Sequence, residues 1–191
     1  MNDATAAMLR KWFKRLNRWL MIPMWRLGLG KPMNIWPSVG GRILVLAHTG
    51  RKSGLRRLTP LNYAPSPPSS VFVLAGFGAR ADWYQNALAN PAVEVWLPDG
   101  RWLAEAIDVS DHPLRMAILR DVLVASGFAA PLAGVNPRRL SDQELEEKTA
   151  DYRLIELQFR ADATGTRGPG DLSWIWVAAA ALWLMDRMRR R

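Results

Sequence analysis

Basic side chains and glycines gather in one short turn, Gly50-Arg51-Lys52-Ser53-Gly54, which follows a stretch rich in apolar residues. Arg56 and Arg57 come directly after it, and no acidic residue lies among these cations. A turn of this kind presents cationic side chains and backbone N–H groups together, which suits a phosphate or a carboxylate. We interpret the turn as an anion site and as part of a cofactor site.

A second stretch combines a glycine turn, Gly76-Phe77-Gly78, with a short helix that contains Trp83, Tyr84 and Asn86. Glycine lets the backbone come close to a ligand because it has no Cβ. Aromatic side chains at the start of a helix pack either against the core or against a planar ligand. On these residues alone, both interpretations stay open.

The sequence offers little material for other site chemistry. It contains no cysteine and only two histidines, His48 and His112. Disulfides and thiolate metal sites are therefore excluded, and a histidine zinc site or a Ser-His-Asp triad lacks residues. We predict no metal and no catalytic acid or base. His48 ends the strand before the basic turn, where it has either a structural role or a polar role near the phosphate.

Short apolar stretches in the middle of the chain predict an antiparallel barrel with helices packed outside it. Pro98-Asp99-Gly100 is expected to join two of the strands as a hairpin. Asp82 is expected to cap a helix that stops before Pro91, and Ser141 and Glu144 form a capping box. The predicted strands are 42–48, 56–64, 71–76, 92–97, 101–109 and 152–160.

Both chain ends differ in composition from the middle. The net charge is +9, with cations crowded near the N-terminus and in residues 187–191. Residues 1–36 are expected to contain a basic amphipathic helix that ends at Pro23, and 163–191 a glycine-rich connector and an apolar helix. Residues 37–162 remain for the barrel domain. The N-terminal helix sets an apolar stripe of Leu9, Trp12, Phe13, Leu16, Trp19 and Leu20 against Arg10, Lys11, Lys14, Arg15 and Arg18.

Tryptophan beside arginine and lysine at the chain ends indicates a membrane interface rather than nucleic acid. Seven of the ten tryptophans fall within residues 12–36 and 174–183. The uncharged stretch 172–185 would reach about 21 Å as a helix, less than a bilayer core of roughly 30 Å. It could span, lie on an anionic membrane surface, or pack on the protein or a partner subunit. We expect the protein at the cytoplasmic face of the membrane.

Two motifs together resemble the deazaflavin-dependent nitroreductase family. They are Thr49-Gly50-Arg51-Lys52-Ser53-Gly54-x-x-Arg57-x-Thr59-Pro60-Leu61 and Trp83-Tyr84-x-Asn86-x-x-Ala89-Asn90-Pro91-x-Val93-x-Val95. The resemblance is best over residues 42–110. It implies an α+β fold, a split β-barrel of the FMN-binding type with about six antiparallel strands, and the deazaflavin coenzyme F-420 as cofactor. It also makes a homodimer possible.

The resemblance further implies that the phosphate and oligoglutamate tail of the coenzyme meet the basic turn, and that its ring meets the next strand. Arg80 is expected near the tail, and Arg56 stands where the family often has proline. The implied cofactor-binding residues are Arg51, Lys52, Ser53, Gly54, Arg57, Thr59, Pro60, Leu61, Gly76, Phe77, Gly78, Trp83, Tyr84 and Asn86.

The implied activity is hydride transfer from reduced F-420 to a lipophilic acceptor such as a quinone, an enone or a nitro compound. The protein would then bind, align and exclude water. Relatives that reduce nitro compounds carry tyrosines after the last hairpin, whereas residues 122–135 contain none; Phe128, Pro131 and Leu132 favour an apolar acceptor. The alternatives are an FMN-dependent split-barrel oxidoreductase and a non-catalytic, membrane-associated protein that binds cofactor or lipid.

Overall fold

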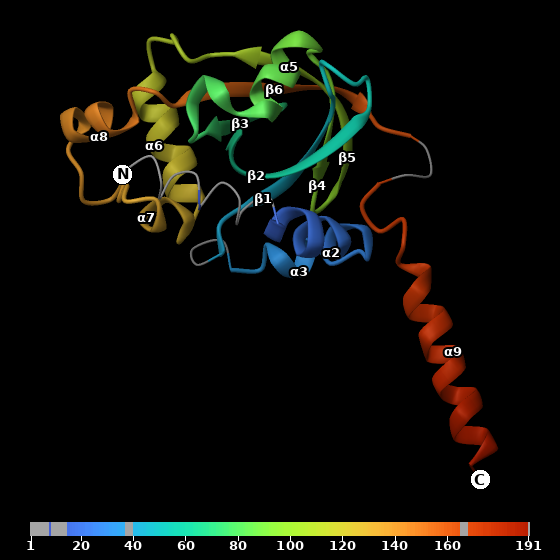
Figure 1. The fold of residues 1–191 in the computed structure, drawn as a ribbon. Helices are drawn as coiled ribbons and strands as arrows, with labels where there is room; N and C mark the ends of the chain where they lie inside the picture. Colours follow the sequence, from blue (N-terminus) through green and yellow to red (C-terminus); the bar gives the residue numbers. More distant parts are fainter. Residues whose placement is uncertain (1–7, 9–14, 37–39, 165–167, 191) are drawn as a thin grey trace.

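The computed structural model describes residues 8, 15–36, 40–164 and 168–190, and its centre is a closed antiparallel barrel (Figure 1). Six strands close it in the order β1-β2-β3-β6-β5-β4. The predicted α+β class and six-stranded barrel are confirmed, and every predicted strand end lies within two residues of the observed one. The strands are β1 (Ile43–Thr49), β2 (Arg56–Ser66), β3 (Ser70–Ala75), β4 (Ala92–Leu97), β5 (Gly100–Asp108) and β6 (Arg153–Asp162).

Side chains alternate between the inside and the outside of the barrel, as the period of a strand requires. Leu44 and Val95 belong to the inner core, which the apolar residues of all six strands fill. On the outer side of β1 and β4, Val45 and Trp96 pack against Trp25, which is fully buried. Burial of one large apolar side chain contributes roughly 1.5–3 kcal/mol. Trp25 therefore fastens the N-terminal segment to the barrel wall.

Helices surround the barrel on several sides. Figure 1 shows α2 and α3 below the barrel, α5 above it, and α6, α7 and α8 together at its left. The helical elements are η1 (Asn17–Met21), α2 (Ile22–Arg26), α3 (Gly30–Met33), η2 (Gly78–Arg80), α5 (Asp82–Ala89), α6 (Arg115–Ala125), α7 (Ala129–Leu132), α8 (Asp142–Thr149) and α9 (Trp174–Arg189).

The N-terminal helix does not end at Pro23, so that prediction is wrong. A π-helical turn, η1, leads directly into α2, and the N–H of Ile22 donates to the carbonyl of Asn17. Proline lacks an N–H and collides with the carbonyl four residues before it in a regular α-helix. The wider π turn moves that carbonyl aside, and the helix continues to Arg26. Residues 9–14 of the predicted amphipathic helix lie outside the described residues.

Asp82 begins α5 but does not cap it. The N-cap is Ala81, which has no side chain that can accept a hydrogen bond. The Asp82 carboxylate instead lies 3.7 Å from the guanidinium of Arg51, while its place in the first turn still suits the helix dipole. The capping box of Ser141 and Glu144 at α8 is confirmed.

The apolar C-terminal helix is confirmed as α9, which projects away from the barrel (Figure 1). None of its described side chains is buried. Within the part of the chain that the structure describes, no helix combines the length and apolar character needed to cross a bilayer.

Candidate functional site

A cavity of about 1150 Å³ lies among the basic turn, β2, η1, α5, α6 and α7. Its lining joins residues that are far apart in the sequence. The basic turn follows β1 and the glycine turn of residues 76–78 follows β3, and both turns lie at the same end of the barrel because β1 and β3 are each antiparallel to β2. Eleven of the fourteen predicted cofactor-binding residues line it, namely Arg51, Lys52, Ser53, Arg57, Thr59, Pro60, Leu61, Gly76, Phe77, Trp83 and Asn86.

Most backbone N–H groups of the basic turn form hydrogen bonds within the turn or with Leu55 directly after it. The N–H of Gly50 donates to the carbonyl of Leu55, and those of Ser53 and Gly54 donate to the carbonyl of Gly50. Gly54 has a φ of +66°, which only glycine adopts readily. The expectation that these amides stand open for an anion is therefore wrong, and the side chains of the turn are its available donors.

Asn86 connects the turn to α5. Its Oδ1 accepts a hydrogen bond of 3.1 Å from the backbone N–H of Arg51 and one of 2.9 Å from the Arg51 guanidinium. Asn86 is only 6% exposed, so both bonds are shielded from competing water. The helix that the sequence predicts as a ligand wall thus also fixes the position of the turn.

The cationic side chains in and directly after the turn differ in the partners that they already have within the protein. Arg57 lies 3.4 Å from the Ser53 hydroxyl, and Lys52 is exposed and has no ion pair among the described residues. Arg56, in contrast, pairs with Glu94 at 3.0 Å and stacks over the ring of Trp96. Lys52 and Arg57 are thus the cations most available to an anionic ligand.

Thr59 stands on the wall of the cavity beside a buried imidazole. The Nε2 atom of His48 lies 3.0 Å from Thr59 Oγ1, and His48 is only 4% exposed. Burial, and secondarily the nearby Arg57 guanidinium, lowers the pKa of His48 to about 4. The imidazole is therefore neutral at physiological pH, and it orients the Thr59 hydroxyl without adding charge to the site.

Three predicted residues do not line this cavity. Tyr84 is buried in the core, and its hydroxyl donates a 2.5 Å hydrogen bond to Asp108; burial, followed by this bond, raises the pKa of Tyr84 to about 12. Gly78 packs so closely that an added Cβ would lie 2.5 Å from the carbonyl oxygen of Asp151. Gly54 lines a different cavity. Core packing therefore accounts for Tyr84, the interpretation that the sequence had left open.

The N-terminal helix contributes a wall of the cavity that the sequence does not indicate. Asn17, Arg18 and Ile22 line the cavity, although the helical wheel had assigned Arg18 to a charged outer face. The π turn rotates the helix relative to a regular wheel, and no pattern in the sequence indicates it. Of the predicted apolar wall, only Leu132 lines the cavity; Phe128 is exposed.

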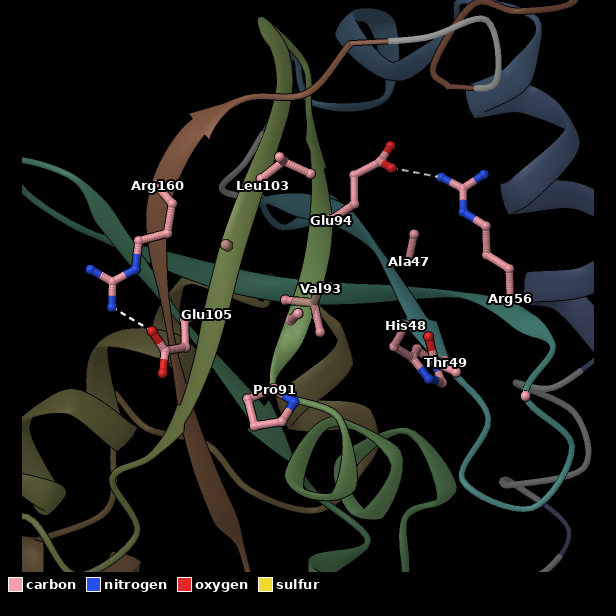
Figure 2. Close-up of a pocket in the computed structure, with 13 residues that line it drawn as sticks. Ala47, His48, Thr49, Arg56, Pro91, Val93, Glu94, Leu103, Glu105 and Arg160 are labelled. Carbon is pink, nitrogen blue, oxygen red and sulfur yellow. Dashed lines mark hydrogen bonds and ion pairs between the residues drawn. The ribbon is translucent and has the colours of Figure 1, made fainter.

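A second cavity of about 600 Å³ lies on the outer side of β1, β4 and β5 (Figure 2). The ion pairs Arg56–Glu94 and Arg160–Glu105 flank it on opposite sides. Its charges balance, unlike those of the first cavity, so it lacks the excess positive charge that an anionic ligand needs. His48 belongs to the lining of both cavities. Apolar residues between the pairs are Ala47, Pro91, Ala92, Val93 and Leu103.

Comparison with solved structures gives relatives of low sequence identity. An F420-H2 dependent reductase (FDR-A) is 23% identical, with 61% of this chain and 94% of that chain covered and a TM-score of 0.46. An F420 reductase is 19% identical, with 68% and 94% covered and a TM-score of 0.44. The heme storage protein HutZ from Vibrio cholerae is 19% identical, with 65% and 83% covered and a TM-score of 0.42.

A comparison with functionally curated proteins gives no match. The family model of the F420H(2)-dependent quinone reductase matches residues 27–131, which is more than half of the chain. The matched range contains the basic turn, the glycine turn of residues 76–78 and α5. This protein therefore belongs to the F420H(2)-dependent quinone reductase family and is a reductase whose cofactor is coenzyme F-420.

Proposed function

We propose that the protein transfers a hydride from reduced F-420 to a lipophilic acceptor, with a quinone favoured over an enone or a nitro compound, at the cytoplasmic surface of a membrane. The observation that carries this proposal is the composition of the first cavity. Its lining combines the cations of the basic turn, called here its cationic end, with apolar residues of β2, α2, α6 and α7, called here its apolar end. Its volume of about 1150 Å³ also exceeds the roughly 300–1,000 Å³ usual for a single small ligand. It offers room for a cofactor and an acceptor together.

The cationic end fits the anionic part of F-420. Lys52 and Arg57 offer charge that no carboxylate in the described part of the chain neutralises, and Ser53 adds a hydroxyl. Arg51 keeps its position through Asn86, and Arg80 lines the same cavity. In this proposal these residues hold the phosphate and the oligoglutamate tail, because charge-assisted hydrogen bonds to such groups are the strong ones.

The apolar end fits a planar ring and a lipophilic acceptor. Thr59, Pro60 and Leu61 of β2 line it, together with Phe77 and Trp83. Ile22, Leu58, Val122 and Leu132 add further apolar surface. No tyrosine from residues 122–135 is present to contact a nitro group, which supports a quinone as the preferred acceptor.

Bound F-420 supplies the hydride, and the chain supplies binding and alignment. Lys52 and Arg57 would hold the cofactor at its anionic end, and Thr59, Pro60 and Leu61 of β2 would contact its ring. The apolar lining excludes water from the space between cofactor and acceptor, which favours transfer between the two ligands over loss to solvent. His48 is neutral and contacts the site through the Thr59 hydroxyl. Hydride addition would leave a quinone one proton short of a hydroquinone, and the proton released when reduced F-420 is oxidised would balance it, so the overall reaction consumes no proton from a side chain.

Exposed tryptophans support the membrane surface. Trp19 and Trp36 are each 76% exposed, and the tryptophans of α9 are also exposed. They accompany Arg18, Lys31 and the arginines at the end of α9, a combination that suits an anionic lipid interface. In this proposal the chain ends, 1–36 and 163–191, attach the barrel of 37–162 to lipid. The homodimer that the resemblance implies stays a prediction.

The experiment that tests this function compares ligands and acceptors on the purified protein. F-420 fluorescence titration should give tight binding, and an equal titration with FMN should give none. Anaerobic oxidation of reduced F-420 should be fast with a menadione-type quinone and slow with a nitroimidazole. Binding of F-420 without any acceptor turnover would favour a cofactor carrier and contradict the proposal.

A further inference from the structure

A segment beyond the family-matched region is attached to the N-terminal helix. The guanidinium of Arg26 donates to both carboxylate oxygens of Asp171, with Nε 3.0 Å from Oδ1 and the terminal nitrogen 2.9 Å from Oδ2. The Asp171 side chain is 9% exposed and that of Arg26 39% exposed. The hydrogen bond to Asp171 raises the pKa of Arg26. This two-point geometry holds the guanidinium in one orientation.

Three further hydrogen bonds join the same two segments. The N–H of Gly170 donates to the carbonyl of Trp25 at 2.9 Å, and the N–H of Leu172 donates to the carbonyl of Arg26 at 2.8 Å. The indole N–H of Trp176, in the first turn of α9, donates to the carbonyl of Leu27 at 3.0 Å. The carbonyls of Arg26 and Leu27 come at the end of α2, where intrahelical donors run out, and these bonds satisfy them. The carbonyl of Trp25 accepts from the N–H of Gly28 as well.

The other end of the same helix forms part of the cavity wall. Asn17, Arg18 and Ile22 line the cavity, and Trp25, one turn further, is buried against the barrel. The described helix is continuous from residue 17 to residue 26. Its orientation at the cavity therefore depends on how its far end is held.

Apart from the burial of Trp25 and a few contacts with β2, little holds the helix against the barrel. Trp19 and Leu20 are exposed, and a helix of this length is marginal without tertiary contacts. The contacts at Trp25, Arg26 and Leu27 are thus the ones that fix its direction.

We propose that Asp171 is a positioning residue, which holds the helix of residues 17–26 through Arg26 and so sets the wall of the cavity where the acceptor binds. The inference rests on the proposed function, because it assigns the wall formed by Asn17, Arg18 and Ile22 to the acceptor. Among the described residues the side chain of Asp171 bonds to Arg26 and to no residue of the basic turn.

The test uses the full-length protein and the variant Asp171→Ala. The matched control is Asp186→Ala, which removes a carboxylate from an exposed ion pair with Arg190 in the same C-terminal segment. Trp176→Phe is a milder second variant, because it removes only the hydrogen bond to Leu27. Hydrogen exchange of residues 17–29, the F-420 dissociation constant and the KM for menadione are measured for each.

In Asp171→Ala, amides of residues 17–29 should exchange roughly tenfold faster or more, as loss of one charged hydrogen-bond pair allows. The KM for menadione should rise severalfold, the F-420 dissociation constant should stay within twofold, and Asp171→Glu should restore much of the loss. Trp176→Phe should shift in the same direction by less. Asp186→Ala should match the wild type.

Exchange in Asp171→Ala equal to that in Asp186→Ala would overturn the proposal. Faster exchange with an unchanged KM would also overturn it, because the contact would then stabilise the helix without shaping the acceptor site. If the wild-type protein binds F-420 but reduces no quinone, that result contradicts the proposed function instead. In that case the exchange comparison still decides whether Asp171 holds the helix.

Discussion

The buried amide of Asn86 accepts two hydrogen bonds from one residue of the basic turn, the backbone N–H and the guanidinium of Arg51. A side chain of α5 thus fixes both the path of the turn and the direction of one of its cations. The turn itself uses most of its other amides internally. If the turn binds the anionic part of F-420 as proposed, it does so mainly through its side chains, and Asn86 holds the side chain of Arg51 in position.

Replacing Asn86 with Ala should weaken F-420 binding although Asn86 carries no charge. The variant leaves the Arg51 N–H without its buried acceptor, which costs about 1–3 kcal/mol, and the turn loses its link to α5. Fluorescence titration with F-420 should show a roughly tenfold or larger rise in the dissociation constant. The nearby Gln85→Ala, which loses a hydrogen bond to the carbonyl of Ala79 at the other side of α5, is the matched control and should bind normally.

Lys52→Ala and Arg57→Ala should each weaken F-420 binding by about 1.5–3 kcal/mol, the usual contribution of a hydrogen bond to a charged group. Arg56→Ala should weaken it less, because Arg56 already pairs with Glu94 and stacks on Trp96. Titrations at low and high salt check this order, since the loss of a cation also reduces the salt dependence. Equal losses in all three variants would show that net charge, and not position, determines affinity.

Much of the fold could be predicted from the sequence because its signals are local. Alternating apolar residues set the strands, and Pro98-Asp99-Gly100 set a hairpin, which the structure confirms. The grouping of the basic turn with Asn86 also followed, since the two motifs resemble one family. These features depend on a few neighbouring residues or on one recognisable pattern.

Other features could not be predicted because they depend on distant contacts. Pro23 predicts the end of a helix, yet a π turn before it allows the helix to continue to Arg26. The sequence predicts the amides of the turn to be open donors, yet internal bonds occupy those of Gly50, Ser53 and Gly54, and Asn86 accepts that of Arg51. The ion pair of Arg26 with Asp171 joins residues 145 positions apart, and no local pattern in the sequence marks either partner.

The neutral state of His48 makes stability depend on pH. Its pKa is about 4 in the folded protein and 6.5 as the ordinary value, so the unfolded chain binds more protons between these limits. The free energy of unfolding should therefore be unaffected by His48 above pH 6.5 and should fall as the pH drops from 6.5 towards 4. The full effect is roughly 3 kcal/mol.

Urea denaturation at several pH values should show this slope in the wild type and a shallower one in His48→Gln. His112→Gln is the matched control, since His112 is exposed near the start of α6, and it should retain the wild-type slope. An unchanged slope in His48→Gln would mean that other groups produce the pH dependence.

Removing residues 177–191 should separate membrane binding from cofactor binding. The truncated chain keeps Asp171 and Trp176, so its N-terminal helix stays attached and F-420 should bind with wild-type affinity. It loses most of the exposed apolar surface of α9 and the final arginines, so sedimentation with anionic vesicles should fall sharply. Binding of the full-length protein should also weaken as salt rises, because screening reduces attraction between arginine and lipid.

A charge variant separates the two contributions of α9. Changing Arg187, Arg189 and Arg190 to Gln keeps the apolar surface and removes the cations, and each lost cation should reduce binding by about 1 kcal/mol near an anionic surface. Vesicles without anionic lipid should show little difference between this variant and the wild type. If the truncated chain sediments as the full-length protein does, α9 does not contact lipid and its exposed tryptophans require a protein partner instead.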